Sequence, residues 1–222
     1  MVTATGFMRA EPILSVIRAY DAWIVRGYCW GRFGILRQRF LDEIGQYLPE
    51  RGRVLDLGCG FGLFSLYYAS VHPGLRLEGF DRNARRIAMA RAASRKLGLS
   101  NVRYETGDVM DFRGNEAFDA AYMLDIVHHI PEEAVRPLLE QMAKVLPTGG
   151  RLLIKDVDRR PAYKRWFTHL LDKVMDPSTP VRYWDAEALT RLLGEVGFSV
   201  HRHLMVDFLP YPHILYICER RP

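Results

Sequence analysis

The fold is decided by the stretch Val54-Leu55-Asp56-Leu57-Gly58-Cys59-Gly60-Phe61-Gly62. A short apolar strand runs into three alternate glycines, and a helical pattern from Leu63 to Val71 follows at once. Glycines let the backbone approach a ligand closely, and the N-terminus of the next helix offers N–H groups to an electron-rich partner. The stretch therefore predicts a strand–turn–helix unit with a ligand over the turn.

The spacing of the glycines bears on which ligand this is. Leu63 stands where a dinucleotide fingerprint needs its third glycine, which disfavours a pyrophosphate cradle and a nicotinamide-dependent oxidoreductase. Asp56 lies at the mouth of the strand, where its carboxylate would repel a pyrophosphate, order the loop and attract an ammonium group.

A second acid follows the next strand. Leu75–Phe80 reads as that strand and ends at Asp81, 25 positions after Asp56. In a doubly wound sheet such an acid points at the ligand crevice, where its two oxygens can accept both hydroxyls of a ribose. The alternative is that Asp81 only caps the helix that begins near Asn83.

Outward from these strands, apolar runs alternate with helical patterns, which predicts βαβ units and a parallel sheet. Near the end, Asp185 can cap a helix through Val196 that Gly197 stops, and two further apolar runs resemble a closing antiparallel pair. The expected elements are a helix at Asn83–Leu97, a strand at Val102–Glu105, a strand at Phe118–Leu124, a helix at Glu132–Val145, and strands at Arg151–Val157, Phe198–Val206 and His213–Cys218.

Residues 11–48 carry apolar groups at helical spacing and are expected to form two helices broken near Gly31–Gly34. We expect an N-terminal helical cap over 1–48 and a core over 49–222, with a substrate-side insertion at 159–184. Without repeats or a long linker, the chain is expected to be a single compact unit.

With this glycine turn and the two acids at the ends of the strands, the sequence resembles the class I, Rossmann-like S-adenosylmethionine-dependent methyltransferases, within the broad group of ubiquinone and menaquinone biosynthesis methyltransferases. The resemblance runs from Arg53 to about Val157. The segments that carry it are Asp56–Gly62, Asp81, Gly107-Asp108-Val109, Phe118-Asp119 through Leu124-Asp125-Ile126-Val127-His128-His129-Ile130-Pro131, and Leu146–Ile154.

The resemblance implies an α/β fold with a doubly wound, mostly parallel seven-stranded sheet and an antiparallel C-terminal strand. It implies S-adenosyl-L-methionine as cofactor, with the glycine turn facing the methionine part, Asp81 on the ribose and Asp108 on the adenine amino group. The expected cofactor-binding residues are Tyr20, Asp56, Gly58, Cys59, Gly60, Gly62, Asp81, Arg82, Asp108, Val109, Met110, Leu124 and Asp125. Tyr20 is expected as a lid.

Catalysis then requires mainly that the acceptor atom be aligned with the S–CH₃ bond of the cofactor. A general base is needed only if the acceptor keeps its proton at neutral pH. His128 and His129 follow the fourth strand, and either is a candidate base; packing or capping is the alternative. Asp125 is expected to hold the cofactor's ammonium or to polarise a histidine. Asp156 and Asp158 are expected in a solvated loop, with substrate contact as the alternative. No metal site is expected.

Composition is that of an ordinary soluble protein: 222 residues, 49% hydrophobic, 26% charged and a net charge of +5. Cys29, Cys59 and Cys218 form neither a disulfide framework nor a ligand pattern, so a reducing, cytoplasmic setting is expected. The basic charge is compatible with nucleic acid, an anionic membrane or an acidic substrate, or with none of them.

The flanks bear on the acceptor. Aromatic residues in the flanks suit a flat or apolar small molecule, although most of them are expected to pack helices onto the sheet. They form two groups: Tyr20, Trp23, Tyr28 and Trp30, and then Tyr163, Trp166, Phe167, Tyr183 and Trp184. The first helices also carry several arginines, which are compatible with peripheral contact with an anionic membrane. These are Arg9, Arg18, Arg26, Arg32, Arg37 and Arg39.

We therefore expect methyl transfer to oxygen or carbon of a small, largely apolar, aromatic or lipid-like acceptor. The alternatives are an RNA or protein methyltransferase and a non-catalytic S-adenosylmethionine-binding subunit of a larger assembly. Nucleic acid is a less favoured partner because the basic residues are scattered.

Overall fold

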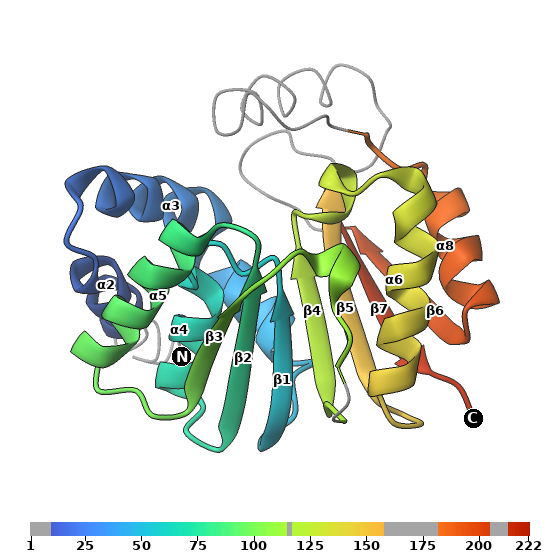
Figure 1. Cartoon of the computed structure of the whole chain (residues 1–222), viewed down its shortest axis with the longest axis horizontal. Coiled ribbons are helices and arrows are strands. Elements are labelled where there is room, and N and C mark those ends of the chain that lie inside the picture. The colour runs from blue at the N-terminus through green and yellow to red at the C-terminus, as the bar shows by residue number, and fades with distance from the viewer. Residues whose placement is uncertain (1–9, 115–116, 158–181, 205–212) are drawn as a thin grey trace, which may run out of the picture. The chain divides into compact units, whose positions relative to one another are not determined.

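The computed structural model describes residues 10–114, 117–157, 182–204 and 213–222, with the side chains of residues 10 and 35–39 excepted (Figure 1). The chain divides into two compact units, residues 1–108 and residues 109–222.

The first unit contains three parallel strands, and its β1 is the strand of the glycine turn. Strands β1 and β2 pair with Asp56 opposite Gly79, and β2 pairs with β3 with Asp81 opposite Thr106. Buried apolar side chains of β1 and α4 explain why this segment folds as predicted. Its elements are β1 (Gly52–Leu57), α4 (Leu63–Val71), β2 (Leu75–Asp81), α5 (Ala84–Lys96) and β3 (Val102–Thr106).

Two N-terminal helices belong to the same unit, α2 (Ala10–Ala19) and α3 (Trp23–Gly45), and α2 packs on α3, α4 and α5. The predicted break at Gly31–Gly34 is wrong, because the chain breaks at residues 20–22 and α3 continues through its glycines. The glycines weaken the helix, but the apolar period continues on its buried face at Val25, Cys29 and Phe33, which packs on aromatic rings of α4.

The second unit contains the remaining strands, with β4 parallel to β5, and β7 antiparallel to both β5 and β6. Helix α6 lies beside β4 and β5 in Figure 1, and α8 packs on β6 and β7. The elements are η1 (Val109–Asp111), β4 (Ala120–Leu124), η2 (Val127–His129), α6 (Glu132–Val145), β5 (Arg151–Val157), α8 (Ala186–Glu195), β6 (Phe198–Leu204) and β7 (His213–Arg220).

The sheet has seven strands in the order β3-β2-β1-β4-β5-β7-β6. This confirms the predicted mostly parallel α/β fold with an antiparallel C-terminal strand. Strand β7 extends to Arg220, beyond the predicted end, because Glu219 pairs opposite Arg151 and Arg220 pairs opposite Phe198. Asp185 caps α8 as expected, since its carboxylate accepts the N–H groups of Glu187 and Ala188.

None of the helices in the described ranges combines the length and apolar content that a bilayer-spanning segment requires.

Candidate active site

The glycine turn leaves β1 in a conformation that favours glycine. The φ angles are 76° at Gly58, 56° at Gly60 and 76° at Gly62. The N–H groups of Gly58 and Cys59 both donate to the carbonyl of Phe80, at 2.7 and 3.1 Å, which ties the turn to the end of β2. A rigid turn of this kind exposes backbone rather than side chains to a ligand.

Gly62 closes the turn and begins α4, and it has no room for a side chain. A Cβ atom there would lie 2.5 Å from the hydroxyl oxygen of Tyr104, a buried residue of β3. The Tyr104 hydroxyl bonds to Ser65 at 3.1 Å, and burial raises its pKa well above the ordinary value, so it stays protonated. Sequence reasoning missed Tyr104 because nothing local connects β3 to the turn.

We expect Gly62→Ala to destabilise the protein by about 2–4 kcal/mol, because it combines a positive φ with a clash against buried Tyr104. The matched control is Gly34→Ala, in the exposed face of α3 with open space around its Cβ position. It should stabilise by about 0.5–1 kcal/mol. Urea unfolding of both variants is the measurement. Equal stabilities would contradict the packing described for the turn.

Asp81 joins the turn to the start of α5. Its Oδ2 accepts the N–H of Gly60 at 2.9 Å, and its Oδ1 accepts the N–H of Asn83 at 2.8 Å. The helix cap is Asn83 instead, whose side-chain oxygen accepts the N–H groups of Arg85 and Arg86 at 3.1 Å. Each carboxylate oxygen keeps a lone pair, which matches the two hydroxyls of a ribose. The two acceptor oxygens of Asp81 therefore suit the cofactor expected here.

Tyr20 ties the N-terminal helices to the turn. Its hydroxyl donates to the carbonyl of Phe61 at 2.8 Å, and burial raises its pKa well above the ordinary value, so the proton stays in place. The ring of Tyr28 packs on Phe61 with centroids 5.5 Å apart, and the Arg86 guanidinium lies 5.4 Å from the same ring. The lid role of Tyr20 stays a prediction, but its contact with the turn is direct.

The other first-unit residues expected at the cofactor differ in exposure. Asp56 is 3% exposed in β1, while Arg82 is exposed and Asp108 is half-buried. Cys59 is buried, and burial, with the nearby Asp56 and Asp81 charges, raises the pKa of its thiol well above the ordinary value. The Cys59 thiol is therefore held in its protonated form. The expected contacts of Cys59 and Asp56 with the cofactor stay predictions.

In the second unit, Val109 is buried in η1 and its neighbour Met110 is 38% exposed. Leu124 ends β4, and Asp125 follows with φ 57°, the one positive φ at a non-glycine residue in the part of the chain the structure describes. This strained residue turns the chain sharply from β4 into η2, which carries both candidate histidines.

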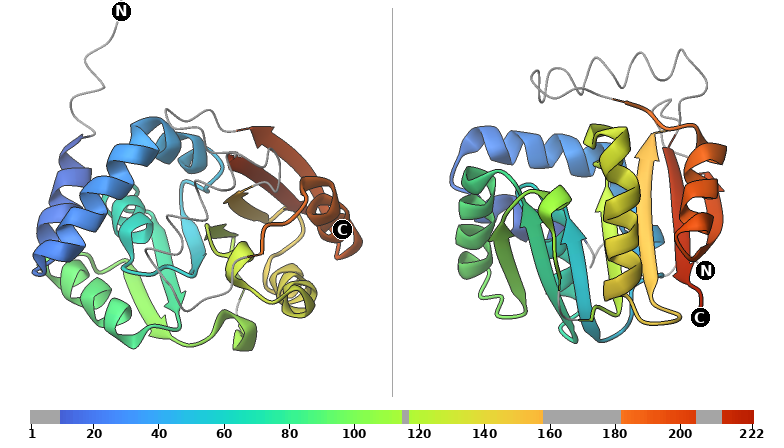
Figure 2. Two further views of the ribbon diagram at one scale, coloured as in Figure 1. Left: turned by 90° about the horizontal axis from the view of Figure 1, so that it is seen from above. Right: turned by 45° about the vertical axis from the view of Figure 1, so that its right-hand side comes forward.

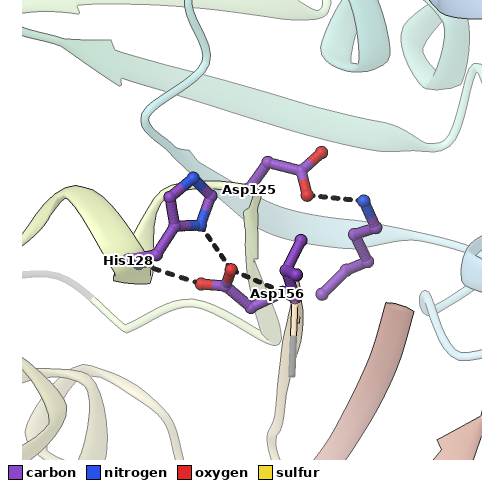
Figure 3. A network of polar contacts seen from close by, with 5 residues as sticks. Asp125, His128 and Asp156 are labelled. Atoms are coloured by element: carbon purple, nitrogen blue, oxygen red, sulfur yellow. Dashed lines mark hydrogen bonds and ion pairs between the residues drawn. The ribbon is translucent and has the colours of Figure 1, made fainter. Parts of the chain in front are cut away.

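His128 and Asp156 form a buried pair. Nδ1 of His128 bonds to Oδ1 of Asp156, and the two side chains face each other in Figure 3. The carboxylate is itself held by the N–H of His128 at 3.0 Å and the N–H of Val157 at 2.7 Å. An ionised carboxylate only accepts hydrogen bonds, so Nδ1 carries a proton, and the neutral ring keeps its basic lone pair on Nε2.

Asp156 is therefore a buried residue of β5, 4% exposed, and the solvated-loop interpretation is wrong for it. The acid beside a histidine is Asp156 rather than Asp125. The charged pair Lys155-Asp156, directly after the apolar run Leu152–Ile154, is a signal that sequence reasoning missed. Asp158 lies outside the described residues.

Asp125 contacts Lys155 instead. Its Oδ1 lies 2.5 Å from Nζ of Lys155, a fully buried side chain, and its N–H donates to the Lys155 carbonyl at 2.8 Å (Figure 3). The ammonium neutralises the carboxylate, and the two bonds hold the turn before η2. Asp125 thus fixes the turn that precedes His128, and its predicted contact with the cofactor stays a prediction.

Two aromatic groups pack on His128. The ring of His129 lies 4.1 Å away by centroids, and the ring of Tyr183 stacks at 5.6 Å. The N–H of Arg182 donates to the His128 carbonyl at 2.8 Å, so the segment that enters α8 is fixed against η2. Tyr163, Trp166 and Phe167 lie outside the described residues.

Among the described residues, no group of three or more His, Cys, Asp or Glu side chains is arranged to hold a metal ion.

Comparison with known proteins agrees with this geometry. Residues 32–203 match the methyltransferase domain family, and the chain belongs to that family. This confirms the resemblance to class I, Rossmann-like methyltransferases, whose methyl donor is S-adenosylmethionine.

Two similar relatives and one solved structure illustrate the match. The chain is 29% identical over 171 residues to O-methyltransferase cnsE of Penicillium expansum, covering 75% of this chain and 59% of that protein. It is 31% identical over 116 residues to the ubiquinone biosynthesis O-methyltransferase of Xanthomonas axonopodis pv. citri, covering 51% of this chain and 46% of that protein. The YcgJ protein of Bacillus subtilis shares the fold, with a TM-score of 0.69, 18% identity and coverage of 84% and 100%. The chain thus spans about half to three-fifths of those two relatives.

Proposed function

We propose that this protein transfers a methyl group from S-adenosylmethionine to a hydroxyl oxygen of a small, largely apolar or aromatic acceptor. The observation that carries the choice of oxygen is the His128–Asp156 pair. A general base helps only where the acceptor keeps its proton at neutral pH, as phenols and alcohols do. The relatives named as O-methyltransferases support the same class of acceptor.

In this proposal the first unit holds the cofactor. Asp81 accepts the ribose hydroxyls, Asp56 attracts the ammonium group, and the Gly58–Gly62 turn presents its backbone to the methionine part. The bound cofactor supplies a methyl group that its sulfonium already makes electrophilic.

The second unit supplies the base. Nε2 of His128 takes the proton of the acceptor hydroxyl, and Asp156 stabilises the imidazolium that results. Lys155 and Asp125 keep the preceding turn in place, so the base is positioned by two independent polar pairs. Tyr183, stacked on His128, offers an aromatic surface to a flat acceptor.

The first test is calorimetric titration with S-adenosylmethionine, its demethylated product and NADH. We expect micromolar binding of the first two and none of NADH, because Leu63 stands where a dinucleotide fingerprint needs its third glycine. Transfer of labelled methyl groups should then favour phenols over amines, RNA and protein. NADH binding alone would overturn the proposal, and transfer to RNA or protein alone would overturn the acceptor class. Tight cofactor binding without transfer to any acceptor would favour a cofactor-binding subunit.

A further inference from the structure

The outward face of α3 is apolar and exposed. Trp23, Gly27, Trp30 and Gly34 recur at intervals of four, three and four residues, which places them on one side of the helix, with Ile24 and Gly31 beside them. Trp23 is 79% exposed, Ile24 65% and Trp30 57%. We call these six residues the tryptophan face.

This face differs from an ordinary solvated helix surface. The side of a helix that faces water normally carries charge, yet none of the six positions does. The three glycines are exposed and have open space around their Cβ positions. Gly27 keeps the surface flat between the two indole rings, and Gly31 and Gly34 keep it flat beyond Trp30, at a cost of up to about 1 kcal/mol each relative to alanine. The face therefore suits a broad, flat partner.

The opposite side of α3 is fixed to the protein. Val25, Cys29 and Phe33 are buried, and Tyr28 packs on Phe61 of the glycine turn. Figure 2 shows α3 at the edge of the first unit, with α2 beside it. Docking through the tryptophan face would thus leave the packed side of the helix and the glycine turn undisturbed.

Charge indicates the kind of partner. Residues 1–108 hold 16 Lys and Arg against 10 Asp and Glu, a formal charge of +6. Residues 109–222 hold 15 against 16, a formal charge of −1. The basic excess thus belongs to the unit that carries the tryptophan face. Helix α5 of that unit has five basic residues and no acidic one. An anionic partner is favoured.

We propose that the tryptophan face docks on the surface of an anionic lipid bilayer. Indole rings prefer the boundary between water and acyl chains, and Ile24 adds apolar area at the same level. The basic unit behind the face supplies attraction to anionic headgroups. Nucleic acid fits the charge of the unit but not the face, which offers no charged side chain to phosphates. The proposal does not depend on the methyltransferase activity.

The test is flotation of the full chain with vesicles of phosphatidylcholine, with or without phosphatidylglycerol. We expect binding to the anionic vesicles, weakened when salt is raised from about 0.1 to 1 M, because the screening length falls from about 10 to about 3 Å. Trp23→Gln with Trp30→Gln should weaken binding at least about tenfold, because both rings lose their apolar contact with lipid. Met89→Gln, an exposed apolar residue of α5 outside the face, is the matched control and should bind normally.

Folding is checked by the melting temperature and the affinity for S-adenosylhomocysteine, which the double variant should keep because both indoles are mostly exposed. Absence of vesicle binding, or binding that the double variant retains, would overturn the proposal. So would a dimer that dissociates in the double variant, since the face would then bind a second copy of this chain. RNA that competes with vesicles and depends on the same tryptophans would assign the face to nucleic acid instead.

Discussion

Replacement of His128 by alanine is expected to lower kcat by about 10²- to 10⁴-fold while leaving the affinity for S-adenosylhomocysteine unchanged. The reason is that Asp156 fixes the Nδ1 proton and leaves Nε2 as the basic atom of the ring. The measurement is steady-state methyl transfer to the best phenolic acceptor from the labelled-methyl screen, with calorimetry for the cofactor product.

The matched control is His129→Ala, because its ring packs on His128 but lies outside the pair with Asp156 described above. We expect less than about a tenfold change in kcat for it. A large loss for His129→Ala with a small one for His128→Ala would transfer the role of base to His129. Small losses for both would show that the acceptor needs no histidine base, as an already ionised oxygen would not.

The pH profile separates a base from a packing residue. A histidine base is inactive when protonated, so kcat/KM should fall on the acid side of the profile. The negative charge of Asp156 stabilises the imidazolium, so Asp156→Asn is expected to move that acid limb to lower pH. The plateau rate should also fall, because an amide no longer fixes the tautomer. A purely structural role would leave the limb in place.

The predictable part of the molecule is the part whose signals are local. Strand β1, the turn through Gly62 and helix α4 follow from apolar residues and glycines that are adjacent in the chain. Asp81 could be placed at the end of β2 for the same reason, although its bond to the N–H of Gly60 could not. The break predicted within α3 is absent because the apolar period that continues through the helix outweighs the low helix propensity of its glycines.

The polar pairs of the second unit are non-local, and for that reason sequence reasoning did not find them. His128 and Asp156 are 28 positions apart, and Asp125 and Lys155 are 30 apart. Their pairing depends on the parallel register of β4 and β5, in which Leu124 lies opposite Lys155. A one-residue difference in that register would place Asp156 on the other side of the sheet. The residue types indicate a polar cluster, but only the register of β4 and β5 decides which acidic side chain pairs with which basic one.

The second large effect concerns Asp81. We expect Asp81→Ala to weaken the binding of S-adenosylhomocysteine by about 1.5–3 kcal/mol, roughly 10- to 150-fold. The loss comes from the ribose hydroxyls and also from the turn, because the N–H groups of Gly60 and Asn83 lose the acceptor they have in the wild type. Calorimetric titration is the measurement. Glu78→Gln, on the same strand and paired with Arg53 at 2.7 Å, is the control and should bind normally.

A deoxyribose analogue of the cofactor product separates the two causes. The wild type should bind the 2′-deoxy analogue more weakly than the parent compound, because one hydroxyl no longer reaches Asp81. The Asp81→Ala variant should bind both compounds alike, since the partner of that hydroxyl is already absent. The coupling free energy in this cycle belongs to the hydroxyl–carboxylate bond, whereas damage to the turn affects both compounds equally. A variant that still discriminates between the two compounds would remove the ribose from Asp81 and leave it the role of fixing the glycine turn.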